Sequence, residues 1–255
     1  MLFCFGELIN LSQKLTFSNN RHYNNPIPAT GNPMLVLHHL NQSRSFRILW
    51  LLCELNTLYG TPFKVIKHNR TKSHLAPKEL TDIHPMGKAP ILVDETRGRT
   101  LAESGFIIEY LLRYYDTDGK LSPTDETWED YAFWLHFAES SMMPPLVMRL
   151  IMSKVATKSP LLVRPIAKKI ADKVESLVIN DNVAQSFGLL NAHLSDKDWI
   201  AGDFTGADVQ AYFAAKALQS RGELGSWDNL KAWLVRCENR AAYKQAVEQG
   251  GKIFK

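Results

Sequence analysis

Cysteine is scarce in this chain of 255 residues, and long apolar runs are missing. The three cysteines, Cys4, Cys53 and Cys237, form no Cys-x-x-Cys pair, so the sequence predicts neither a disulfide framework nor a cysteine-based zinc site. The longest apolar run, residues 48–53, is far shorter than the roughly 20 residues that span a bilayer. We therefore expect a chain made in a reducing compartment, the cytoplasm, without stable membrane insertion.

An excess of charge is missing too. Thirty Lys and Arg face 26 Asp and Glu, a net charge of +4, and the two signs are interleaved along the chain. This distribution gives little support to nucleic-acid binding. The densest basic pair, Lys168-Lys169, fits a solvated helix face better than a phosphate site. The adjacent His38 and His39 point to opposite faces of a predicted strand, so we expect no metal site.

Residues 1–33 differ from the rest of the chain. They are rich in Asn and Ser and end in a Pro/Gly-rich run at 26–33, which predicts a flexible N-terminal extension. Low acidity and scattered hydroxyls are typical of an organellar transit peptide, yet arginine is too scarce to favour targeting. Whether these residues form a targeting leader stays open.

The remainder divides near residue 120 into an α/β half and a helical half. Residues 34–118 alternate strands and helices, with strands expected at 35–40, 63–68, 89–94 and 100–102 and helices at 44–55 and 103–115. Residues 124–250 show helical periodicity only, at 125–155 with a bend at Pro144-Pro145, 162–195, 206–220 and 228–248. Thr205 and Asp208 predict a capping box at the start of the third of these helices.

Two features of the α/β half could carry chemistry. Pro90 opens a strand, and a cis Ala89-Pro90 bond would leave the backbone of Ala89 free to pair with an extended ligand. Glu103 and Ser104 begin a helix, where Ser104 could serve as a cap or could join the helix N-terminus in holding a zwitterion.

These motifs recur together in a known order. The segments HPMGKAPIL at 84–92, LAES at 101–104 and IIEYL at 107–111 resemble the glutathione-binding half of glutathione S-transferases. HLNQSRSFRILWLL at 39–52 and WLHFAESSMMPPL at 134–146 are similar to the first strand and helix and the long fourth helix of the fungal GTT-type transferases and their bacterial relatives. The resemblance covers residues 35–250.

The resemblance implies a thioredoxin-like N-terminal domain, an all-helical C-terminal domain and glutathione as co-substrate, with no metal. It also implies that Lys88 meets the glycyl carboxylate, that Ala89-Pro90 pairs with the tripeptide backbone, and that Glu103 and Ser104 hold the γ-glutamyl end. The family usually forms two-fold dimers, for which the aromatic run at 128–137 is a candidate. The implied reaction is conjugation of the glutathione thiolate to a small hydrophobic electrophile.

Activation of the thiol needs a donor, because a thiol with a pKa of roughly 8.5 is mostly protonated at neutral pH. The loop before the first helix offers Ser43, Arg44 and Ser45; we favour Ser43, with the other two as close rivals. No cysteine occupies this loop, which argues against the glutathione-dependent branches that use a Cys nucleophile.

The long helix supplies candidates for an apolar electrophile pocket. Trp134, Phe137 and Met142, with Met148, could line it, although such residues at helical spacing are more often plain core. Two other functions remain open: a glutathione-dependent peroxidase or biosynthetic transferase, and a non-catalytic glutathione-binding regulatory or interaction module. The identity of the electrophile cannot be predicted from these residues.

Overall fold

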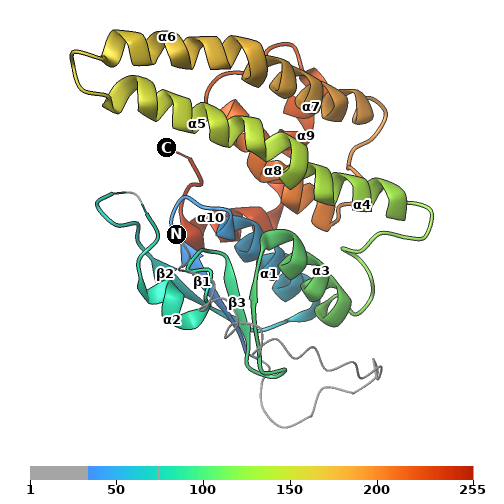
Figure 1. Ribbon diagram of the computed structural model, residues 1–255. Coiled ribbons are helices and arrows are strands. Elements are labelled where there is room, and N and C mark those ends of the chain that lie inside the picture. The colour runs from blue at the N-terminus through green and yellow to red at the C-terminus, as the bar shows by residue number, and fades with distance from the viewer. Residues whose placement is uncertain (1–33, 74, 255) are drawn as a thin grey trace, which may run out of the picture. The chain divides into compact units, whose positions relative to one another are not determined.

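Four strands form one mixed sheet in the first half of the chain (Figure 1). The computed structural model describes residues 34–73 and 75–254, which belong to one compact unit, and the extension predicted at 1–33 lies outside them. The strand order is β2-β1-β3-β4, with β1 parallel to β2 and the other neighbours antiparallel. The strands are β1 (Leu35–Leu40), β2 (Phe63–His68), β3 (Ile91–Asp94) and β4 (Arg99–Ala102).

Helix α1 (Ser45–Tyr59) makes the crossover that parallel pairing of β1 and β2 requires. Every residue from Ser45 to Leu55 is buried, which confirms the buried helix predicted from its apolar faces. It packs against α3 (Ser104–Tyr115) and against α10 (Ala241–Gly250), so both halves of the chain cover it. The short α2 (Glu79–Ile83) completes the α/β half, and this half confirms the thioredoxin-like expectation.

After Tyr115 the described elements are helical, as predicted, apart from two isolated bridges at 199–203. The remaining helices are α4 (Trp128–Phe137), the π-helix η2 (Ala138–Met142), α5 (Met143–Lys158), α6 (Arg164–Val174), the π-helix η3 (Glu175–Ile179), α7 (Asn180–His193), α8 (Gly206–Gln219) and α9 (Asp228–Asn239). Helices α4 and α5 run end to end, and α6 lies beside α5 (Figure 1). The predicted boundary between residues 118 and 124 falls in the connection from α3 to α4 and stays a prediction.

The long helix is irregular next to the proline pair, where the sequence predicts a bend. Residues 138–142 form a π-helix, and α5 then begins with Pro144 and Pro145 in its first turn. Pro145 has no N–H to give to the carbonyl of Ser141, and Ser186 on α7 supplies a donor to that oxygen at 3.3 Å. A neighbouring helix therefore satisfies the group that the proline leaves without a partner.

The predicted helix at 228–248 is two helices. Arg240 separates α9 from α10 and adopts an extended backbone, with φ −63° and ψ 136°. Its guanidinium reaches back to α1 and makes two bonds to Glu54, Nε to Oε1 at 2.6 Å and Nη2 to Oε2 at 2.8 Å. The residue at the break between α9 and α10 thus makes a long-range ion pair, and helical periodicity does not reveal either the break or the pair.

The capping box predicted at the start of α8 is present. Thr205 accepts from the backbone of Ala207, while Asp208 accepts from the backbone N–H of Thr205 at 2.9 Å. Asp208 is fully buried, and its other oxygen accepts from Trp233 Nε1 and from the N–H of Ile200. The box therefore joins α8 to α9 and to the preceding turn as well as starting a helix.

Among residues 34–73 and 75–254, no helix is long and apolar enough to cross a membrane.

Candidate active site

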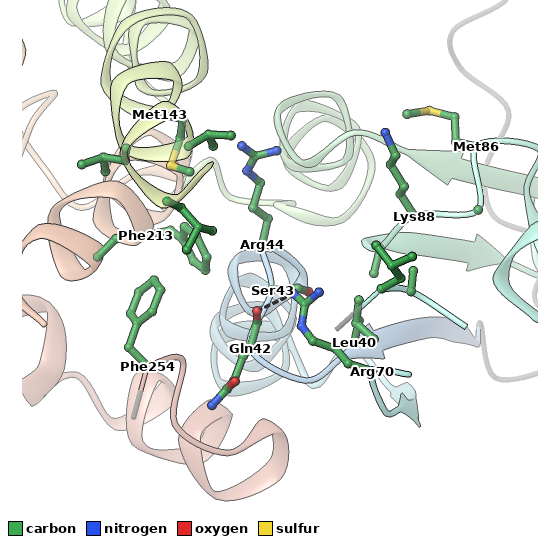
Figure 2. Close-up of a pocket in the computed structure, with 18 of the residues that line it drawn as sticks. Leu40, Gln42, Ser43, Arg44, Arg70, Met86, Lys88, Met143, Phe213 and Phe254 are labelled. Carbon is green, nitrogen blue, oxygen red and sulfur yellow. Dashed lines mark hydrogen bonds between the residues drawn. The ribbon is translucent and has the colours of Figure 1, made fainter. Parts of the chain in front are cut away.

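A pocket of about 690 Å³ opens between the α/β half and the helical half (Figure 2). Its walls come from the loop after β1, the segment between β2 and α2, the turn at 86–89, α5, α8 and the end of the chain. The residues that line it are Leu40, Gln42, Ser43, Arg44, Arg70, Leu75, Ala76, Thr81, Met86, Gly87, Lys88, Ala89, Met143, Leu146, Val147, Leu150, Phe213, Ala217, Ser220, Arg221 and Phe254.

The polar wall of the pocket is the loop between β1 and α1, which carries Gln42, Ser43 and Arg44. Arg70 holds this loop in place: its Nη2 donates to the carbonyl of Gln42 at 2.7 Å, the dashed contact in Figure 2, and its Nε donates to the carbonyl of Asn41. Gln42 has φ 52°, a left-handed conformation that few non-glycine residues adopt. The loop thus has a defined conformation at the N-terminus of α1.

The opposite wall is apolar except for Ser220 and Arg221. Helix α5 contributes Met143, Leu146, Val147 and Leu150, which share one face at the spacing i, i+3, i+4, i+7. The rings of Phe213 and Phe254 lie side by side below it, with centroids 5.1 Å apart (Figure 2). One side of the pocket can therefore bind polar groups while the other excludes water.

The three candidates for thiol activation occupy different environments. Ser43 lines the pocket although only 8% of its surface is exposed. Arg44 also lines it and forms an ion pair with Glu139, Nε to Oε2 at 3.5 Å. Ser45 is fully buried behind the pocket wall and does not line it. Ser43 and Arg44 can thus meet a ligand directly, whereas Ser45 can act only through a neighbour.

Ser45 connects Ser43 to a buried histidine. Ser43 Oγ lies 2.7 Å from Ser45 Oγ, which lies 2.9 Å from Nδ1 of His39. Nε2 of His39 lies 3.2 Å from the carbonyl oxygen of Gly250 at the end of α10. The sequence suggests no role for His39 beyond that of a possible metal ligand. Strand alternation places it opposite His38, but its contact with a residue 211 positions away has no local signal.

The residues implied for glutathione are divided between the pocket and its surroundings. Lys88 and Ala89 line the pocket, and the Ala89-Pro90 bond is cis. Glu103 and Ser104 are not among the lining residues: Ser104 is 4% exposed and its Oγ accepts from Nη1 of Arg47 at 3.1 Å. Glu103 is exposed and has φ 73°, at the N-terminus of α3.

The apolar wall differs from the one expected. Trp134 and Met142 are buried in the core, and Phe137 stacks on Phe133 with centroids 5.0 Å apart; none of the three expected residues lines the pocket. The π-helix η2 separates α4, which carries Trp134, from α5. Val147 and its neighbours on α5 occupy the wall, and Met148 lines a smaller adjoining pocket with Arg44.

In the part of the chain that the structure describes, no cysteine lines the pocket and no metal-binding cluster is present. Cys53 and Cys237 are both buried, and burial raises the pKa of the Cys53 thiol to about 12. Neither lines the pocket. Within residues 34–73 and 75–254, no three His, Cys, Asp or Glu side chains are grouped so as to hold a metal ion.

Family descriptions and known proteins are similar to this chain in sequence. The family description "Glutathione S-transferase, N-terminal domain" matches residues 32–113, and "Glutathione S-transferase, C-terminal domain" matches residues 147–241. Glutathione S-transferase 3 of Schizosaccharomyces pombe is 33% identical over 220 residues, 85% of this chain and 88% of that protein. Glutathione S-transferase 1 of Saccharomyces cerevisiae is 30% identical over 227 residues, 85% of this chain and 95% of that protein.

A solved structure agrees. The crystal structure of a glutathione S-transferase from Actinobacillus pleuropneumoniae superposes with a TM-score of 0.68 at 30% identity, and covers 85% of this chain and 93% of that one. These matches confirm both the fold and the resemblance that the motifs indicated. The chain belongs to the glutathione S-transferase family.

Proposed function

We propose that this protein binds glutathione in the 690 Å³ pocket and transfers its thiolate to a small hydrophobic electrophile. The observation that carries this proposal is that the pocket sets a wall with the polar side chains of Gln42, Ser43, Arg44 and Lys88 against a mostly apolar wall from α5, α8 and Phe254. A tripeptide with charged ends suits the first wall and an apolar electrophile suits the second. Holding both reactants in one cavity accelerates the reaction by proximity.

Glutathione would lie with its backbone against Ala89, which precedes the first paired residue of β3, Ile91. Lys88 would meet the glycyl carboxylate, and the γ-glutamyl end would extend beyond the pocket lining to the N-terminus of α3, beside Glu103 and Ser104. The left-handed backbone of Glu103 supports this assignment, because such conformations in non-glycine residues concentrate at ligand sites.

Ser43 is the group that we propose for thiol activation, since its hydroxyl lines the pocket at the start of α1. Arg44 is the rival at the pocket, and its positive charge would stabilise a thiolate at longer range. Ser45 would act only through Ser43, because it is fully buried.

We also propose a cytoplasmic homodimer. Trp128 and Phe133 on α4 expose 58% and 49% of their surface, and large exposed aromatic side chains on one helix are typical of protein interfaces. Sedimentation velocity of the wild type and of Phe133→Glu tests this assembly: we expect a dimer that the added charge dissociates, and a monomeric wild type would contradict it.

Calorimetric titration of the full chain with glutathione is the first test of function. We expect binding by the wild type and an approximately tenfold weaker affinity in Glu103→Gln, because a charge-assisted hydrogen bond contributes roughly 1.5–3 kcal/mol. Glu109→Gln, on the exposed face of the same helix, is the matched control and should bind as the wild type does.

Activity assays then separate the candidate reactions. Conjugation of an activated aryl chloride would support the transferase, while turnover of a hydroperoxide in its place would indicate the peroxidase. Glutathione binding without either turnover would leave the interaction module. A wild type that binds no glutathione would overturn the proposal altogether.

A further inference from the structure

The hydrogen bonds behind Ser43 have a direction that one backbone group determines. The carbonyl of Gly250 can only accept, so Nε2 of His39 carries the hydrogen that fills the 3.2 Å contact. In a neutral imidazole the other nitrogen, Nδ1, is then an acceptor. Ser45 Oγ, 2.9 Å away, must donate its single hydrogen to it.

Ser45 passes this constraint on to the pocket. With its hydrogen directed at His39, Ser45 Oγ has two lone pairs, and the N–H of Leu40 at 3.1 Å donates to one of them. The other faces Ser43 Oγ at 2.7 Å, so Ser43 donates inward. Ser43 Oγ also accepts from the N–H of Ser45 at 3.1 Å. The hydroxyl therefore presents a lone pair to the pocket and cannot donate to a thiolate there.

We propose that His39 is the terminal acceptor of the glutathione thiol proton, which reaches it through Ser43 and Ser45. The S–H proton moves to Ser43 Oγ, the Ser43 proton moves to Ser45 Oγ, and the Ser45 proton moves to Nδ1 of His39. One S–H bond breaks and one N–H bond forms, leaving a thiolate and an imidazolium. The inference rests on the proposed function, because glutathione supplies the proton.

The product state of this transfer has every hydrogen-bonding group satisfied. Nε2–H of the imidazolium stays on the Gly250 carbonyl, and Nδ1–H now donates to Ser45 Oγ. The Ser45 hydrogen turns to Ser43 Oγ or to the Leu40 carbonyl at 3.2 Å. Ser43 holds the hydrogen that came from the thiol and donates it to the thiolate. The same transfer thus generates the thiolate and creates its donor.

The surroundings of His39 favour a neutral ring before glutathione binds. Burial lowers its pKa most, and the charges of Lys67 and His68 on β2 lower it too. Its bonds to Gly250 and Ser45 act in the opposite direction and raise the pKa. A thiolate at the pocket would add a negative charge at the other end of the chain and offset the cost of the imidazolium.

Nitrogen NMR of the His39 imidazole in the wild-type protein tests the direction of the chain without any variant. We expect the Nε2–H tautomer in the free protein and a ring that is protonated at both nitrogens when glutathione is saturating. An Nδ1–H tautomer in the free protein would overturn the inference, whatever glutathione does.

His39→Asn tests the transfer itself, since its side-chain oxygen can accept from Ser45 but cannot take a proton. We expect the glutathione affinity to stay within about twofold, the pKa of the bound thiol, followed by thiolate absorbance, to rise, and kcat at neutral pH to fall about 10²-fold. His38→Asn is the matched control: the neighbouring histidine contacts His68 at 3.0 Å on the other face of the sheet and should leave the thiol pKa unchanged.

The outcomes separate the two proposals. A bound thiol with the wild-type pKa in His39→Asn, or an equal rise in His38→Asn, would overturn the relay while leaving glutathione binding intact. Absence of glutathione binding by the wild type would overturn the proposed function and, with it, the substrate of the relay. Ser45→Ala, which breaks the chain at its middle, should raise the thiol pKa as His39→Asn does.

Discussion

Ser43 and Arg44 are adjacent in the sequence and both line the pocket, yet they offer different chemistry. The serine hydroxyl is nearly buried and bonded at short distance, which fixes where its oxygen lies. The arginine side chain is 40% exposed and pairs with Glu139, so its charge is both screened and partly neutralised. Geometry therefore favours the serine as the group that contacts sulfur.

Replacing these two residues separately distinguishes their roles. We expect Ser43→Ala to lower kcat/KM for conjugation about 10²-fold, because the thiolate loses its donor, and Arg44→Met to lower it by less than tenfold. Steady-state kinetics at fixed pH provides the measurement. Ser220→Ala, which removes a hydroxyl from the opposite side of the same pocket, should change little. A larger loss in Arg44→Met would transfer the role to the arginine.

At the level of single elements, α5 forms the apolar wall at which we propose that the electrophile binds. Its pocket-facing residues follow one stripe of the helix, and Val147 stands in the middle of that stripe. Val155 lies two turns further along α5, outside the pocket, and is as exposed as Val147, at 38%. Val147 and Val155 therefore allow the same substitution to be compared inside and outside the cavity.

Filling the apolar wall should affect one substrate only. Val147→Trp should raise KM for a bulky electrophile several-fold by occupying pocket volume, while the affinity for glutathione stays at the wild-type value. Val155→Trp on the same helix should leave both constants unchanged. If Val147→Trp weakened glutathione binding by the same factor, α5 would be part of the tripeptide site.

The capping box of α8 makes the free energy of unfolding depend on pH, because Asp208 is part of it. Burial is the largest influence on Asp208 and raises its pKa from 3.8 to about 6, although four hydrogen bonds act against it. The folded protein then binds more protons at this group than the unfolded chain does between about pH 4 and pH 6. Ionisation of Asp208 therefore costs stability as the pH rises through this window.

Comparing the wild type with Asp208→Asn isolates this effect from all other carboxylates. The free energy of unfolding of the wild type, relative to that of the variant, should fall by roughly 2.5 kcal/mol from pH 4 to pH 7, at about 1.4 kcal/mol per unit of pKa shift and with the unfolded carboxyl already partly ionised at pH 4. Urea unfolding at several pH values measures it. A relative stability that rose with pH would mean that the hydrogen bonds outweigh burial.

In the whole molecule, ion pairs between α1 and the helical half connect the two halves of the chain. Arg47 is fully buried and pairs with Glu139 in η2, and its guanidinium lies 5.1 Å from the centre of the Phe213 ring. Glu54 accepts from Trp50 Nε1 on its own helix and from Arg240 between α9 and α10. Helix α1 is therefore tied to the helical half by two ion pairs, one with η2 through Arg47 and one with the α9–α10 junction through Glu54.

Arg240→Ala should lower the free energy of unfolding by roughly 3 kcal/mol, because it leaves the carboxylate of Glu54 buried without its cation. Lys231→Ala removes a cation from an exposed pair with Asp228 and should cost less than about 0.5 kcal/mol. Denaturant unfolding of both variants measures the contrast. Equal losses would show that burial of Glu54 adds nothing to this pair.

Four features follow from the amino-acid sequence alone: the order of strands and helices, the burial of α1, the α8 capping box and the family. Each of these depends on neighbours within a few positions: alternation, helical spacing, a cap three residues from its partner, or a short motif. The same local signals placed Ser43, Lys88 and Ala89, all of which line the pocket.

Which residues face one another across that pocket depends on how the whole chain folds. The apolar wall lies on α5 and does not include Trp134, Arg240 between α9 and α10 pairs with Glu54, 186 positions away, and the end of α10 supplies the carbonyl that orients His39. Periodicity reports whether a side chain is buried, because burial repeats along an element. It does not report the partner, because partners come from distant segments that meet only when the chain has folded.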